Sequence, residues 1–180
     1  GYDFYANDGN PSPDDPYSPD LLFDDVHGTH VGGTIAAAGN NRRGVVGVAW
    51  QASLMSLRFV GPEGTGDGAD AARAIAYATA NQARLTNNSW GGERRNSAII
   101  EAISEANSKD VLFVAASGNG DLLGRAINND ERPQYPASYE IENVISVAAS
   151  NRSGQLTSFS NYGVISVDLA APGRDIYSCY

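Results

Sequence analysis

The stretch VLFVAA, residues 111–116, decides the fold that the sequence predicts. It is a run of apolar residues stopped at once by the turn-forming residues SGNG at 117–120. A short apolar run between turn residues is typical of a strand buried on both faces, as in a parallel sheet. Because ligands of open α/β sheets bind beyond the carboxyl ends of the strands, any chemistry is expected where this strand ends.

The segments on either side alternate between strand and helix. Residues 52–60 and 144–149 are expected to be strands, 85–89 a weaker and more polar strand, 70–83 and 97–108 helices, the second capped by Asn96, and 164–171 a last apolar segment. This alternation predicts an α/β fold with a mainly parallel sheet. A length of 180 residues fits a single domain, or part of one.

Composition excludes several classes of protein. The formal charge is -9 and Lys109 is the only lysine, so we expect no nucleic-acid partner. No apolar run approaches the length of a membrane span, so we expect no membrane association. Cys179 is the single cysteine, which excludes an intrachain disulfide and a zinc site built on thiolates.

The sequence HGTHVGGT at 27–34 joins a titratable group to small, tightly packing residues at a predicted helix start. Because imidazole gains and loses a proton near neutral pH, His27 is a candidate general base. A purely structural histidine is the alternative. His30, one turn on, is expected to be structural, and a metal site using both histidines has no evident third ligand.

Two further features concern ligands. Glycine-rich loops at 61–68, 89–92 and 117–119 follow the predicted strands, and such loops let an extended polypeptide pair with exposed backbone. The N-terminal part is acidic, and it favours either a cation site or a solvated loop. Seven aspartates precede Arg42, the first basic residue: Asp3, Asp8, Asp14, Asp15, Asp20, Asp24 and Asp25.

Several of these motifs together resemble the subtilisin-like serine proteases, the subtilases of peptidase family S8. The sequence HGTHVGG at 27–33 is similar to their histidine motif, and AASGN at 115–119 to their oxyanion motif. The segments NSWGG at 88–92, YPA at 135–137, FSNYG at 159–163 and AAPG at 170–173 follow in the family's order. The resemblance covers essentially the whole chain and implies a three-layer α/β/α fold, incomplete at both ends.

The resemblance also implies roles for individual residues. His27 would be the general base of an Asp-His-Ser triad, and Asn119 would donate its amide to the developing oxyanion. The substrate groove would be lined by Val60, Gly64, Gly66, Ser89, Trp90, Gly91, Ala116, Ser117 and Gly118. The family's aspartate would precede Gly1 and its serine would follow residue 173. We therefore expect 1–180 to be the central part of one catalytic domain, inactive and marginally stable by itself.

The N-terminal loop resembles the calcium-binding loop of thermitase-like members of the family. The matching positions are Asp3, Asp8 and Asn10, whose oxygen atoms suit a hard cation. Ala6 stands where some relatives have another carboxylate. A second departure is Gly32, where the family usually has alanine, and this change is expected to cost helix stability without affecting the chemistry.

The leading hypothesis is therefore a secreted, calcium-binding serine endopeptidase that acts on extended polypeptides, is made with a propeptide and is a monomer. The alternative is a pseudoprotease or peptide-binding module that keeps the groove without the triad. A nucleotide-binding domain is disfavoured because the chain has neither a P-loop lysine nor a GxGxxG sequence after a strand.

Overall fold

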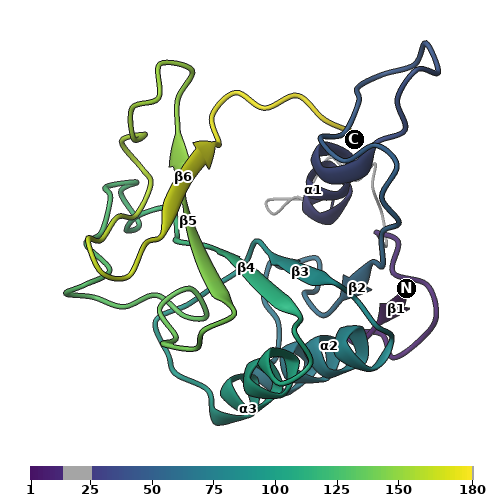
Figure 1. Ribbon diagram of the computed structural model, residues 1–180, viewed down its shortest axis with the longest axis horizontal. Coiled ribbons are helices and arrows are strands. Elements are labelled where there is room, and N and C mark those ends of the chain that lie inside the picture. The colour runs from purple at the N-terminus through teal and green to yellow at the C-terminus, as the bar shows by residue number, and fades with distance from the viewer. Residues whose placement is uncertain (14–25, 180) are drawn as a thin grey trace. The chain divides into compact units, whose positions relative to one another are not determined.

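The computed structural model describes residues 1–13 and 26–179, which form two compact units. The first unit comprises residues 1–74 and the C-terminal residues from 176 on, and the second comprises residues 75–175. Each unit contains its own parallel sheet (Figure 1). The expected aspartates at 14–25 lie outside the described residues. No helix in the described part of the chain is long and apolar enough to cross a membrane.

The second unit is built on four parallel strands whose order in the sheet follows their order in the chain. They are β3 (Leu85–Asn88), β4 (Leu112–Ala116), β5 (Val144–Ser150) and β6 (Leu169–Pro172). The apolar run that predicted β4 places Phe113 and Ala115 in the core, with exposed fractions of 0% and 1%. The mixed α/β fold with a parallel sheet is confirmed.

Helix α3 (Ser97–Asn107) makes the connection that two parallel neighbours require, between β3 and β4. Its predicted N-cap is confirmed, because the Asn96 side chain accepts hydrogen bonds from the N–H groups of Ala98 and Ile99. The helix packs against β4 through an apolar stripe with helical spacing. The buried residues of this stripe are Ile99, Ala102, Ile103 and Ala106.

Helix α2 (Gly68–Ala80) begins in the first unit and ends in the second. Asp67 precedes it and accepts a hydrogen bond from the N–H of Ala69 at 2.6 Å, which satisfies one of the unpaired donors of the first turn. The helix starts and ends a few residues before the predicted bounds of 70–83. It stops before Gln82, which has a φ of 61° and so lies outside the helical region.

The sheet of the first unit is short. Strand β1 (Tyr2–Asp3) pairs with β2 (Leu57–Arg58), whereas the sequence predicted a strand over 52–60. The pairing ends because β1 turns back after Asp3, which forms an antiparallel bridge with Asp8. At this point Asp3 is fully buried and accepts a hydrogen bond from Arg58 Nη1 at 2.9 Å.

Helix α1 (His27–Ala36) is the predicted helix of small residues. Its last carbonyls accept backbone hydrogen bonds from residues 47–49, so the helix end is satisfied without a capping side chain. A Cβ atom at Gly33 would lie 2.7 Å from Cys179 Sγ, and Ser178 Oγ donates to the His30 carbonyl at 2.6 Å. At Gly33, the small residue therefore permits close packing against residues 178–179.

Two adjacent glycines of α1 test this packing. Gly32→Ala is expected to raise the free energy of unfolding by about 0.5–1 kcal/mol, because alanine removes backbone freedom from the unfolded chain. The added Cβ would meet Leu54 Cδ1 at 3.5 Å, an ordinary contact. Gly33→Ala is expected to lower stability through its clash with Cys179. Urea unfolding of both variants is the measurement, and a gain in stability for Gly33→Ala would contradict the packing described.

Candidate active site

The predicted site residues fall into two groups, one in each unit. The first unit holds His27, Val60, Gly64 and Gly66, together with Asp3, Asp8 and Asn10 of the N-terminal loop. The second unit holds Ser89, Trp90, Gly91, Ala116, Ser117, Gly118 and Asn119.

His27 is the first residue of α1 and is exposed, while Val26 before it is buried with 2% of its surface accessible. Val26 thus anchors the helix start and leaves the imidazole at the surface. No described residue hydrogen-bonds to the His27 side chain. An imidazole in this position is available to accept a proton from a bound group.

His30 differs from His27 in its surroundings. Its Nε2 lies 3.2 Å from the carbonyl oxygen of Ile176, and its own carbonyl accepts the hydrogen bond from Ser178. These contacts tie α1 to the C-terminal residues of the same unit. They agree with the structural role that the sequence predicted for His30.

The loop that contains Val60, Gly64 and Gly66 is a tight turn. Val60 and Gly66 form an antiparallel bridge, and Gly61 N–H donates to the Thr65 carbonyl at 2.9 Å. Gly64 has a φ of 73°, and a Cβ at Gly66 would lie 2.6 Å from the Phe59 carbonyl oxygen. Both glycines are exposed and both are required by the geometry, so the loop presents backbone rather than side chains.

In the second unit, the ends of two neighbouring strands bring the site residues together. Asn88 at the end of β3 pairs with Ala115 of β4, which ends at Ala116, so residues 89–91 and 117–119 leave the sheet at the same edge. Reciprocal backbone hydrogen bonds of 2.8 Å between Gly92 and Tyr135 hold the first of these loops. Ligands of parallel sheets bind at such an edge.

Within residues 116–119, exposure to solvent differs from residue to residue. Ala116 and Asn119 are exposed, whereas Ser117 is buried, with 1% of its surface accessible. The Ser117 carbonyl accepts hydrogen bonds from the side-chain amides of Asn129 at 2.8 Å and Asn161 at 3.1 Å. The segment is therefore held through the carbonyl of the buried Ser117, while Asn119 remains exposed.

The sequence did not predict that Asn129 and Asn161 are part of this site. Both are buried, with 1% of their surface accessible, and both lie in segments rich in turn-forming residues. In such segments asparagine is ordinarily an exposed turn residue. The only available signal was the position of Asn161 within the FSNYG segment that resembles the family.

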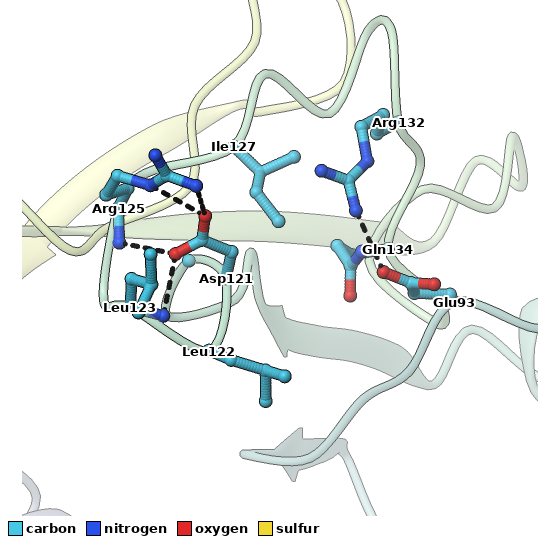
Figure 2. Close-up of a pocket in the computed structure, with 9 residues that line it drawn as sticks. Glu93, Asp121, Leu122, Leu123, Arg125, Ile127, Arg132 and Gln134 are labelled. Carbon is cyan, nitrogen blue, oxygen red and sulfur yellow. Dashed lines mark hydrogen bonds and ion pairs between the residues drawn. The ribbon is translucent and has the colours of Figure 1, made fainter.

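A hollow of about 470 Å³ lies between residues of the loops that follow β3 and β4, and Gly120, the residue after Asn119, is part of its lining (Figure 2). Its lining residues are Glu93, Gly120, Asp121, Leu122, Leu123, Arg125, Ile127, Arg132 and Gln134. Figure 2 shows Ile127 between two ion pairs, Asp121 with Arg125 at 2.7 Å and Glu93 with Arg132 at 3.1 Å. The hollow thus combines an apolar centre with charged sides.

The ion pair between Asp121 and Arg125 is reinforced by a backbone hydrogen bond from Arg125 N–H to Asp121 Oδ1. The Arg125 side chain, hydrogen-bonded to Asp121, lowers the pKa of that carboxyl to about 2, with help from the backbone N–H of Arg125. Asp121 is therefore ionised at neutral pH. Because the pair is exposed to water, it contributes little to stability and acts mainly to shape the loop.

In the N-terminal loop, the aspartate side chains accept hydrogen bonds from protein groups. Asp3 Oδ1 accepts hydrogen bonds from the N–H groups of Tyr5 and Ala6, and Oδ2 accepts the one from Arg58. Asp8 Oδ1 accepts a hydrogen bond from Asn10 N–H at 2.8 Å. Among the described residues, no group of three or more His, Cys, Asp or Glu side chains lies close enough to hold a metal ion.

Comparison with known proteins gives consistent matches. The chain is 36% identical over 180 residues to "Thermitase" of Thermoactinomyces vulgaris, covering 100% of this chain and 57% of the relative. It is 39% identical over 178 residues to "Thermophilic serine proteinase" of Bacillus sp. (strain AK1), covering 99% and 39%. The chain thus spans 57% of the length of the first relative and 39% of the length of the second.

A solved structure agrees with these matches. One of the proteases from Pseudoalteromonas arctica superposes with a TM-score of 0.69 at 34% identity, over 80% of this chain and 42% of that one. The model of the subtilase family, Peptidase_S8, matches residues 2–179 of this chain. Together with the histidine at the start of α1 and the exposed asparagine beyond β4, these matches establish that the chain belongs to the subtilase family of serine proteases.

Proposed function

We propose that the full-length protein is a serine endopeptidase in which His27 is the general base and Asn119 is an oxyanion donor. The observation that supports this most directly is the exposed Asn119 side chain beyond the carboxyl end of β4. No described residue hydrogen-bonds to it, so its amide can donate to a ligand. The aspartate and the serine of the triad would come from segments outside residues 1–180.

The proposed chemistry follows from these two groups. His27 takes the proton of the serine hydroxyl as the oxygen attacks the scissile carbonyl, and the imidazolium then returns a proton to the leaving amine. The Asn119 amide hydrogen-bonds to the oxyanion of the tetrahedral intermediate. Because this hydrogen bond is stronger in the transition state than in the substrate, it raises kcat.

The substrate in this proposal is an extended polypeptide. Ser89 and Gly91 in the second unit, and Gly64 and Gly66 in the first, are exposed and lie in loops that present backbone groups. Such loops can pair with an extended chain as an added strand. Val60, Trp90 and residues 116–118 would contact its side chains.

Other properties of the proposal rest on the family and on charge. We propose that residues 1–180 form part of one catalytic domain, and that the protein is secreted, made with a propeptide and monomeric. A net charge of -9 supports the absence of a nucleic-acid partner.

Covalent labelling tests the catalytic role. A serine-directed fluorophosphonate is expected to label the full-length protein, and His27→Ala is expected to abolish labelling because the serine hydroxyl loses its base. His30→Ala is the matched control and should still label, since His30 is assigned to structure. Folded full-length protein that does not label would contradict the proposal and favour a peptide-binding pseudoprotease.

A structural calcium ion is proposed for the N-terminal loop. The side chains of Asp3, Asp8 and Asn10 offer only oxygen ligands, which fits a hard cation. The fit is incomplete, because Asp3 Oδ2 already accepts a hydrogen bond from the positively charged Arg58. Asp8 and Asn10 would therefore supply the main side-chain ligands and the site would be weak. A bound ion would stabilise the loop without entering the reaction.

Chelation tests this ion. EDTA is expected to lower the melting temperature of the full-length protein, because a ligand that binds only the folded state stabilises it. Asp8→Asn should remove the difference between calcium and EDTA. Asp67→Asn, a change in an aspartate that caps α2, should keep the difference. A melting temperature that EDTA leaves unchanged would contradict the calcium proposal.

A further inference from the structure

The side chain of Asn161 uses all of its hydrogen-bonding capacity inside the second unit. Its Oδ1 accepts hydrogen bonds from the N–H groups of Gly120 at 2.8 Å and Ile127 at 3.1 Å. Its Nδ2 donates to the Ser117 carbonyl at 3.1 Å and to Asn129 Oδ1 at 3.0 Å. An asparagine amide has two donor hydrogens and two acceptor lone pairs, so none remains unused.

These contacts hold the backbone on both sides of Asn119 in the chain. Ser117 and Gly120 hydrogen-bond to the Asn161 side chain, and the Gly118 carbonyl accepts a hydrogen bond from Asn161 N–H at 2.9 Å. The Ser117 hydroxyl donates to the Asn161 carbonyl at 3.1 Å. One residue, distant in the sequence, therefore fixes the backbone immediately before and after Asn119.

The conformation at Gly118 makes this arrangement specific. Gly118 has a φ of 113°, in the region that favours glycine, and a Cβ there would collide with Asn161 Nδ2. The backbone of 117–120 and the amide of Asn161 thus fit together only in this form. Asn119 itself is exposed, so its direction depends on the backbone rather than on contacts of its own.

We propose that Asn161 is a positioning residue that holds the Asn119 amide in the direction needed to meet the oxyanion. This inference rests on the proposed function. An oxyanion donor acts because it is oriented before the charge develops, so a small displacement is expensive. A misplacement of about 1 Å can cost on the order of a hundredfold in rate.

A purely structural role for Asn161 has a different signature. Loss of stability lowers the fraction of folded enzyme, which active-site titration counts, and it leaves the kcat of each folded molecule unchanged. A positioning role lowers kcat per titrated site with KM preserved. It also acts only when the Asn119 amide is present, so the effects of the two residues are not additive.

The test is a double-mutant cycle in the full-length protein. Asn161→Asp keeps the acceptor that serves Gly120 and Ile127 and removes the donors to Ser117 and Asn129. It is expected to lower kcat on the order of ten- to a hundredfold, with little change in KM. In an Asn119→Ala background the same substitution is expected to have almost no further effect on kcat.

Asn151→Ala is the matched control. Asn151 Oδ1 also accepts two backbone hydrogen bonds, from Ser153 and Gln155, but in an exposed turn after β5. The Asn151→Ala substitution should leave kcat unchanged. If Asn161→Asp does not fold, Asn129→Ser carries the same test, because it removes one partner of the Asn161 amide.

The outcomes separate this inference from the proposed function. Consider a wild type that turns over substrate while Asn161→Asp lowers kcat equally in both backgrounds, or does not lower it at all. Either result would overturn the positioning role alone. Folded wild-type protein that shows no turnover would overturn the proposed function and this inference with it.

Discussion

The interaction on which the candidate site depends is the set of hydrogen bonds made by the buried Asn161 amide. A parallel sheet brings the ends of β3 and β4 to one edge, but it does not determine the direction of the residues that follow. After Ala116 the chain leaves the ladder, and its backbone groups need other partners. Asn161, together with Asn129, supplies them. The backbone on either side of the exposed Asn119 is thus held by two buried asparagines.

In the first unit, a charged side chain satisfies the backbone where a strand ends. Asp3 is fully buried where β1 ends, and its carboxylate binds the N–H groups of the next turn and the guanidinium of Arg58. Removing Arg58 would leave a buried, unpaired carboxylate, which is costly. The same pair would limit the proposed binding of calcium, because one carboxylate serves both the turn and the arginine. The proposed calcium site accordingly depends on Asp8 and Asn10 more than on Asp3.

Sequence patterns predicted those parts of the fold that depend on local chemistry. The apolar run at 111–116 predicted β4, and Asn96 predicted the start of α3, because burial and N-capping leave signals in adjacent residues. The length of β2 could not be predicted, since it depends on where its partner β1 turns away. The hydrogen bonds of Asn161 could not be predicted either, because its partners at 117, 120, 127 and 129 are distant in sequence. His27 was proposed from the chemistry of imidazole at a helix start as well as from motif resemblance, and Asn119 from motif resemblance alone. The exposure of both residues is compatible with the proposed roles.

In the proposed mechanism, this subtilase domain positions the Asn119 amide to stabilise an oxyanion. The most direct measurement is kcat of Asn119→Ala in the full-length protein, with the number of active sites determined by titration. The account predicts a fall in kcat of about a hundred- to a thousandfold at nearly constant KM, the range found for the comparable donor in another member of this family. An unchanged kcat, or a loss confined to KM, would contradict it.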